Sequence, residues 1–568
     1  MSAATLLRRL AELEACRYQF GRDQAARTFK ALAQVAVERF TDVPSLIRFH
    51  EALLVLRAFP PSPQVLRQSE RLLRNFWKRV ELLRKAGVDM EDFDPLEVSG
   101  IAGTSMQDTL GFELVRWLVR HLPGKVEIAW DEYDDERPMG AVWPRILPLA
   151  DEDASVEADT PWRRWLTAAR GKQDELAWFV GRFEELDFSA LDRARIYESL
   201  RLPIRWHLGN SRVSRTLNWQ SVRKVFYHEE PLLTRRDVSL KSELTRRPPE
   251  LVRRSRNGGE AIIDLIREVM LVRYRELYGT TLGDPHSVVR ADVGRGVSIY
   301  LWNLPPERRL PLRAYVAGLT LKNGVPINYI EAIGLFEWME MGFNTFYTFR
   351  GGEVAWIFAQ VLRCLCALMG VTCISMYPYQ LGHNNEEAIE SGAFWFYRNL
   401  GFRPGRRELF QLAEREELRI ARNPAYRSSV RTLRRLASGH VFCELPGSQV
   451  GDWDRFSTRT IGLRVNQEIG RKFDGDTQGF RKAAITRLAR FLGTDVPAPG
   501  SPIRASFEEY AAVMSLVAEL RSWNASEKQN LLKIIQARSG PAEMRYLRLL
   551  QRHGKLRAAM LKLGSGPR

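Results

Sequence analysis

Residues 343–404 read FNTFYTFRGGEVAWIFAQVLRCLCALMGVTCISMYPYQLGHNNEEAIESGAFWFYRNLGFRP, and this stretch decides the fold. The pattern predicts, in order, a strand (Phe343–Phe349), a glycine turn (Arg350–Gly352), a helix (Glu353 to about Met369), a second strand (Val371–Met376) and a second helix that ends at Gly401. A glycine-rich turn between a strand and a helix exposes backbone N–H groups at the helix start, where a phosphate can bind. The stretch therefore predicts a candidate anion cradle inside a domain that mixes helices and strands.

The segment before this stretch predicts antiparallel strands. An amphipathic helix over Ala261–Tyr278 precedes strands over Val297–Trp302, Ala314–Leu321 and Val325–Ile333. The last two strands are joined by Lys322-Asn323-Gly324, and Asn-Gly between apolar extended runs is a strong hairpin signal. Together with residues 343–404, these elements predict one α+β domain with a mixed sheet and flanking helices.

Helical patterns and changes in composition divide the rest of the chain. We expect an N-terminal helical region (1–123), an acidic loop or linker (124–160), a helical region with a basic segment (161–257), the α+β domain (258–445) and a C-terminal helical region (446–568). The predicted fold is thus an α+β domain between N-terminal and C-terminal all-α regions.

The composition is that of a soluble globular protein, with 45% hydrophobic and 27% charged residues in 568. The longest apolar run, Val354–Met376, is interrupted by Arg363 and Gly370, so no membrane span is expected. The N-terminal residues alternate charged and apolar types and lack a continuous apolar core for a signal peptide. We therefore expect a cytoplasmic protein.

Five cysteines at irregular spacing suit reduced thiols better than a disulfide framework. Cys364, Cys366 and Cys373 are a candidate metal cluster, but the Cys-x-Cys lies in an apolar helix and has no matching second pair. We therefore expect no metal site. The sequence also lacks the P-loop, HExxH and GxSxG motifs.

The formal net charge is +17, from 85 Lys and Arg against 68 Asp and Glu. Such a surface attracts nucleic acid, anionic lipid or phosphorylated ligands without choosing among them, and a solvated charged surface is the alternative. Eight Lys and Arg lie in segment 235–256 around Pro248-Pro249. This segment is a candidate contact for nucleic acid, or else an exposed crossing between domains, which the lack of interleaved aromatic residues favours.

At its end, the stretch 343–404 resembles the GNAT superfamily of N-acyltransferases. Ala393-Phe-Trp-Phe-Tyr-Arg-Asn-Leu-Gly-Phe-Arg-Pro404 is similar to the "A..FY.KLGF.P" signature of that family. The order of helix, antiparallel strands, strand, glycine turn, helix, strand and helix is similar as well. The resemblance covers about residues 258–445 and does not extend to the helical flanks.

The resemblance implies a binding loop for the pyrophosphate of acetyl-CoA or another acyl-CoA at Arg350, Gly351, Gly352, Glu353, Val354 and Ala355. Arg350 and Ala355 match the family pattern, but Glu353 stands where the family has its central glycine. A carboxylate in the first turn of a helix occupies the electrostatic niche that a pyrophosphate would use. Either Gly351 and Gly352 shift the loop to restore the cradle, or the site is degenerate.

The resemblance also places Tyr397 as general acid toward the departing thiolate, a role that suits a phenol. For the general base we consider His383, in the insertion 377–385, and Glu337, with Glu331 and Glu340 as further carboxylates. Asn384 followed three residues later by Glu387 predicts a capping box at the start of the last helix, which offers a structural role for that segment.

Three functions follow from these observations. The first is transfer of an acyl group from acyl-CoA to the amine of a small molecule or peptide. The second is a non-catalytic GNAT-like scaffold or a binding module for a polyanion or partner. The third is an aminoacyl-tRNA-dependent transferase, because the size and helical flanks are similar to Fem-type enzymes, although a second GNAT-like half is not visible.

Overall fold

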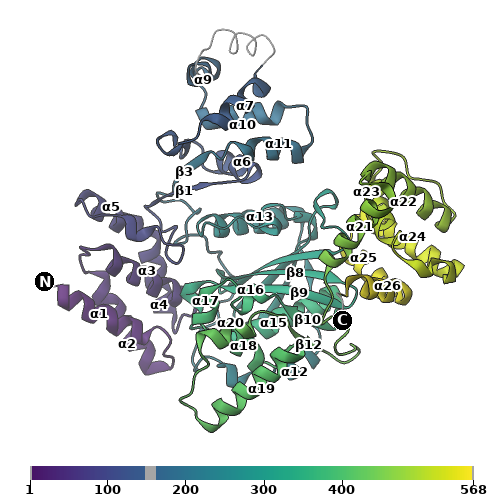
Figure 1. Cartoon of the computed structure of the whole chain (residues 1–568). Helices are drawn as coiled ribbons and strands as arrows, with labels where there is room; N and C mark the ends of the chain where they lie inside the picture. The colour runs from purple at the N-terminus through teal and green to yellow at the C-terminus, as the bar shows by residue number, and fades with distance from the viewer. Residues whose placement is uncertain (1–2, 148–161, 566–568) are drawn as a thin grey trace.

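The computed structural model describes residues 3–147 and 162–565 (Figure 1). A large sheet lies at the centre. The N-terminal helices lie at one side of it, a separate lobe projects above it, and the C-terminal helices lie at the opposite side (Figure 1). The predicted α+β class is confirmed, because helices and a mixed sheet make up the described chain.

In the described chain the central sheet has nine strands in the order β11-β12-β10-β9-β8-β7-β6-β5-β4. Neighbouring strands are antiparallel except β9 and β10, which run parallel because helix α15 crosses over between them. The strands are β4 (Val252–Arg253), β5 (Val289–Gly294), β6 (Val297–Trp302), β7 (Ala314–Lys322), β8 (Val325–Leu335), β9 (Trp338–Thr345), β10 (Cys373–Met376), β11 (Arg403–Pro404) and β12 (Val441–Glu444).

The predicted Asn-Gly hairpin is confirmed between β7 and β8. Asn323 has a φ of 47° and Gly324 a φ of 84°, and positive values at both turn residues define the turn that matches the twist of paired strands. Every residue of β7 is buried, so this hairpin forms the middle of the core rather than an edge.

The crossover after β9 follows the predicted order with shifted boundaries. Strand β9 ends at Thr345, and residues Tyr347–Phe349 form a short 3-10 turn, because the pairing with β8 stops there. Helix α15 (Val354–Met369) ends at Gly370, whose φ of 68° closes the helix in the left-handed conformation. The predicted final helix is instead three short helices: α16 (Pro378–Leu381), α17 (Glu386–Glu390) and α18 (Ala393–Asn399).

The N-terminal helices pack into the same core as the sheet, with Leu10, Leu53 and Phe59 fully buried. Helical pairing is interrupted at Asn75-Phe76, between the fourth and fifth helices. The helices here are α1 (Ala3–Cys16), α2 (Arg22–Ala36), α3 (Val43–Ala58), α4 (Pro63–Arg74) and α5 (Trp77–Lys85).

The prediction of an all-α N-terminal region is wrong, because the lobe above the sheet contains strands. It holds an antiparallel sheet with the strand order β1-β3-β2 and has a hydrophobic core of its own. Strand β2 and helix α7 lie within the predicted acidic loop, and residues 148–160 of that loop lie outside the described residues. Its elements are β1 (Ser105–Thr109), α6 (Phe112–His121), β2 (Val126–Ile128), α7 (Arg137–Ile146), α9 (Trp162–Arg170), α10 (Glu175–Glu185), α11 (Ala190–Ser199) and β3 (Pro203–His207).

The basic segment lies against the central domain, where it forms α12 (Leu240–Thr245) and β4 and leads into α13 (Arg256–Leu271). Several of its arginines have partners in the protein. Arg235 donates to the carbonyl of Asn399, and Arg246 pairs with Glu243 within the segment. The segment is therefore a packed crossing over helix α15 rather than a free arm.

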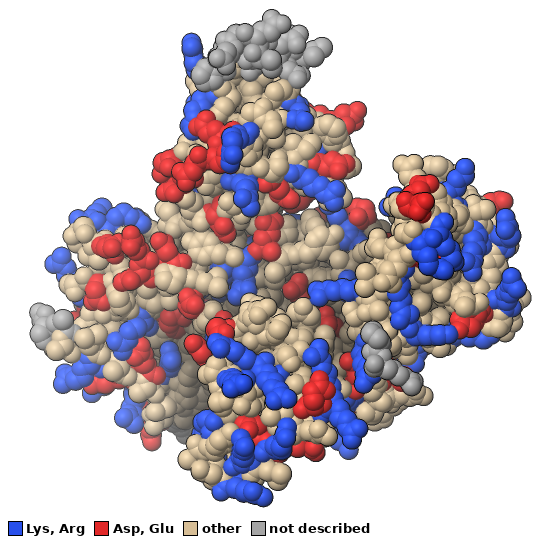
Figure 2. Space-filling model, in the orientation of Figure 1, with Lys and Arg blue, Asp and Glu red and all other residues tan. Residues whose placement is uncertain are grey.

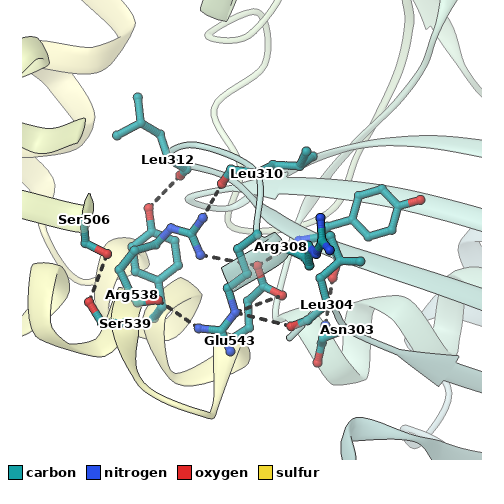
Figure 3. A network of polar contacts seen from close by, with 12 residues as sticks. Asn303, Leu304, Arg308, Leu310, Leu312, Ser506, Arg538, Ser539 and Glu543 are labelled. Atoms are coloured by element: carbon teal, nitrogen blue, oxygen red, sulfur yellow. Dashed lines mark hydrogen bonds and ion pairs between the residues drawn. The ribbon is translucent and has the colours of Figure 1, made fainter. Parts of the chain in front are cut away.

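Helices α19 and α20 lie between β11 and β12, and the other helices follow β12; Figure 3 shows where the C-terminal ones hold the loop between β6 and β7. Arg309 donates to the carbonyls of Arg538 (2.8 Å) and Gly540 (2.6 Å), and Tyr546 donates to the carbonyl of Leu312 (2.6 Å). The buried carboxylate of Glu543 lies 3.8 Å from Arg309 and from Arg538. The helices are α19 (Arg407–Arg422), α20 (Val430–Leu436), α21 (Thr458–Phe473), α22 (Thr477–Leu492), α23 (Pro502–Met514), α24 (Ala525–Ser539), α25 (Glu543–Gln551) and α26 (Gly554–Gly564).

The surface carries Lys and Arg over all lobes of the face in Figure 2, with Asp and Glu interspersed. Among the described helices, none has both the length and the apolar character that crossing a membrane requires. All five cysteines are free thiols, and no group of three metal-ligating side chains occurs in residues 3–147 and 162–565.

Candidate functional site

A cleft of about 280 Å³ lies at the carboxyl end of β9. Strands β9 and β10 pair only from Trp338–Met341, after which their chains separate, and the amide of Phe343 is bonded instead to the side-chain oxygen of Gln380 (3.4 Å). Open sheets bind ligands at the carboxyl ends of parallel strands, where such a gap forms. The cleft is lined by Phe343, Asn344, Thr345, Arg350, Val354, Gln380, Asn385, Glu387, Ala388, Ser391, Ala393, Phe396 and Tyr397.

Tyr397 lies in the wall of this cleft on α18. Its ring packs edge-on against Phe358 (centroids 5.6 Å apart) and Phe402 (5.8 Å), and the residue is 4% exposed. Burial raises the pKa of its hydroxyl above the ordinary value, so the group stays protonated at neutral pH. The geometry suits a proton donor and equally suits a packed core tyrosine.

Arg350 and Glu387 form an ion pair at the edge of the cleft. Glu387 also accepts a hydrogen bond from the hydroxyl of Tyr347 (2.7 Å), and the Arg350 guanidinium stacks over the Tyr347 ring at 4.0 Å. The predicted capping box at Asn384 and Glu387 is wrong, because Asn385 caps the helix by accepting from the amide of Ala388 (3.2 Å). Glu387 is thereby left to face the cleft.

The predicted pyrophosphate loop is divided by the fold. Arg350 and Val354 line the cleft, whereas Gly351, Gly352, Glu353 and Ala355 do not. A Cβ on Gly351 would lie 2.7 Å from the ring of Tyr18, and one on Gly352 would lie 2.7 Å from the ring of Phe59. The two glycines therefore allow the N-terminal helices to approach the turn closely.

Glu353 points away from the cleft and is fully buried. Its carboxylate binds Arg295 (2.8 Å to Nε) and Lys322 (3.3 Å), and accepts from the amide of Leu233 (3.2 Å). Burial alone would raise the pKa of Glu353, but these partners outweigh it and lower the pKa. Burial lowers the pKa of Lys322 to about 8 despite the attraction of Glu353.

The predicted bases lie outside the cleft. Glu337 accepts two hydrogen bonds of 2.9 Å from Arg557 and one of 2.8 Å from the indole of Trp453. His383 is exposed in the turn after α16 and donates its backbone amide to the carbonyl of Pro378 (3.0 Å). The structure brings neither side chain to Tyr397.

The two further carboxylates also have structural partners. Glu331 accepts from the hydroxyl of Tyr315, and Glu340 binds His440 (2.7 Å). Glu387 is therefore the carboxylate that lines the cleft, and it was not among the bases predicted from the sequence.

Two buried arginines, Arg215 and Arg273, line a small pocket next to the cleft. This pocket and the cleft share Asn344, Thr345 and Arg350 as lining residues. Arg273 is 5% exposed, lies 3.9 Å above the ring of Phe346 and donates to the carbonyl of Val269 (2.7 Å). Burial and the neighbouring charge of Arg215 lower its pKa well below the ordinary value. No sequence signal marks this group, because its members lie in separate segments.

In comparisons with models of protein families, with curated proteins and with solved structures, nothing matches this chain.

Proposed function

We propose that the cleft at the carboxyl end of β9 binds the acyl end of an acyl-CoA and transfers the acyl group to an amine of a small molecule or peptide. One observation carries the proposal. The residues that resemble the GNAT signature put Tyr397 into the wall of a cleft between two parallel strands that separate at their carboxyl ends.

In the proposed reaction the amine nitrogen attacks the thioester carbonyl carbon. A C–N bond forms, the C–S bond breaks, and the Tyr397 hydroxyl gives its proton to the leaving sulfur. The Tyr397 hydroxyl is protonated at neutral pH, and burial, which raises its pKa, makes it a weaker acid than a free phenol. Glu387 would take the proton that the amine loses, since it is the carboxylate at the cleft.

For the phosphates of the donor, the cleft offers Arg350. Its guanidinium lies at the cleft edge and is bound to Glu387, an ion pair that a phosphate would have to open. The glycine turn holds two of its amides within the turn, because Gly352 donates to the carbonyl of Phe349 (2.9 Å) and Val354 to that of Gly352 (2.9 Å). Donor recognition therefore depends on Arg350 rather than on the turn.

Calorimetric titration with acetyl-CoA tests the proposal. We expect binding in the wild type and a loss of about tenfold in affinity in Arg350→Ala, as for a charged hydrogen bond. Arg434→Ala is the matched control, because Arg434 forms an ion pair with Glu386 on the same helix α17 but does not line the cleft. Absence of binding at millimolar acetyl-CoA, or equal losses in the two variants, would contradict the proposal.

A second candidate is a non-catalytic module on a GNAT-like domain. The specific observation in its favour is the packing of Tyr18 and Phe59 against Gly351 and Gly352, which gives these glycines a structural role. A polyanion held by the basic segment would be its partner. The Fem-type alternative gains no support, since the second sheet in the described residues has three strands rather than a repeat of the central one.

A further inference from the structure

A second cavity, of about 840 Å³, lies over the sheet near β5 and β6. One wall is formed by the cross-strand pairs Arg290–Tyr300 and Asp292–Ser298 of these strands. The opposite wall is segment 220–226. The cavity shares no lining residue with the cleft that holds Tyr397.

Segment 220–226 is fixed at both ends to the Asn323-Gly324 turn. The amide of Gln220 donates to the carbonyl of Gly324 (2.9 Å), and the amide of Phe226 donates to the side-chain oxygen of Asn323 (2.9 Å). Between these points the chain has no regular secondary structure. The exposed Arg223 and Lys224 are therefore carried on a short bridge whose ends cannot move away from the cavity.

The cavity wall has more positive than negative charge. Arg290 pairs with Asp292 (2.7 Å), and Arg295 pairs with the buried Glu353. Three further cations, Arg223, Lys224 and Arg254, line the same cavity, and among the described residues none of them has a carboxylate partner.

Arg254 completes the basic lining of the cavity. Its Nε is buried against the start of α13, 3.4 Å from the place of a Cβ on Gly258, while the residue lines the cavity. A guanidinium is a group that binds phosphate oxygens in pairs. An anion in the cavity would give Arg223, Lys224 and Arg254 the opposite charge that they lack among the described residues.

We propose that this cavity binds a small molecule that carries a di- or triphosphate group, such as a nucleoside triphosphate. The volume falls in the range of about 300–1,000 Å³ that is usual for small-molecule sites. The hydroxyl group of Tyr300 lines the cavity beside the cations and can donate to a further phosphate oxygen, whereas Ser298 already donates to Asp292 (2.6 Å).

A nucleic acid strand fits the cavity less well than a small phosphate compound does. Strands are held in open grooves whose aromatic faces stack with the bases. Here the ring of Phe226 is already covered by Arg295 at 5.2 Å and Lys322 at 5.2 Å.

The test is calorimetry of the full chain at low salt with ATP and with sodium tripolyphosphate as probes. We expect binding of both in the wild type and a loss of about tenfold or more in the double variant Arg223→Ala/Lys224→Ala. Circular dichroism should show that this exposed pair can be removed without unfolding. The double variant Arg481→Ala/Lys482→Ala removes an equally exposed adjacent pair on α22, far from the cavity lining, and should keep wild-type affinity.

Three results would overturn the proposal. They are absence of binding of both probes at millimolar concentration, equal loss of affinity in the two double variants, and tighter binding of a single-stranded RNA oligonucleotide that depends on Arg223 and Lys224. Failure of acetyl-CoA to bind at all would leave the present proposal standing, because the two cavities are tested by different variants.

Discussion

The carboxylate of Glu353 joins three segments that are distant in sequence, through Leu233, Arg295 and Lys322. The Lys322 and Glu353 side chains are both 0% exposed, whereas Arg295 keeps 22% of its side chain exposed. The two cations of this network therefore differ in how much solvation they lose.

We predict that Glu353→Gln lowers the free energy of unfolding by about 3–5 kcal/mol, because it leaves a buried Lys322 without a counter-charge. Lys322→Met should lower the free energy of unfolding by less, since Glu353 still has the partly solvated Arg295 as its counter-charge. Urea unfolding of the two variants and the wild type measures the difference. Equal losses would show that the ion pair with Lys322 is not what stabilises this network.

Part of the cleft could be predicted from the sequence, and the rest could not, because only some of its residues belong to local patterns. Arg350, Val354 and Tyr397 belong to a local pattern of turn and helix, which a sequence displays directly. Glu387 faces the cleft only because Asn385 takes the cap. The partner of Glu337 is 220 residues away, and no local pattern indicates such a pair.

At the scale of elements, the start of α15 rests against the N-terminal helices. Phe59 is fully buried, and a Cβ at Gly352 would also lie 3.0 Å from the carbonyl oxygen of Phe349. Beside Gly351 the three nearest atoms all belong to the ring of Tyr18, a partly exposed side chain, and none to the backbone.

We predict that Gly352→Ala lowers the free energy of unfolding by about 1–3 kcal/mol through overpacking, and that Gly351→Ala costs less. Urea unfolding of the two variants measures which of these losses is larger. If the glycines instead served a diphosphate, both variants would lose affinity for acetyl-CoA while their stability stayed at the wild-type value.

The elements predicted well are those with long periodic patterns or special turn residues, such as α15 and the Asn-Gly hairpin. The short strands β1, β2 and β3 were missed. Strand β1 reads SMQDT, which has no run of β-branched or aromatic residues, and its place in a sheet comes from pairing with β3 almost 100 residues later.

At the scale of the whole molecule, helix α13 belongs to two cores. Ile262 and Ile266 lie in the core of the central sheet, and Leu271 lies in the core of the upper lobe. Between them is Glu268, whose Oε2 is buried without a hydrogen-bond partner. Burial raises the pKa of Glu268 to about 7, with Arg212 opposing the shift and Asp264 adding to it.

Because the folded chain holds this proton more tightly than the unfolded chain does, stability is lost as the pH rises from about 4.5 through 7. We predict that Glu268→Gln is more stable than the wild type by about 2 kcal/mol near pH 8, and that the difference shrinks near pH 5. Thermal unfolding at the two pH values measures it. A difference that does not vary with pH would mean that Glu268 is ionised throughout.

The Asn323-Gly324 turn has a consequence for synthesis of the chain. Asn323 donates to the carbonyl of Ala58 (2.9 Å) and accepts from Arg57 (2.8 Å), contacts that span 265 and 266 residues. Domains fold as their residues leave the ribosome, and the end of α3 emerges long before its partner is made. The contacts of Arg57 and Ala58 with Asn323 can therefore form only after the hairpin has been made, so the end of α3 emerges with these partners still missing.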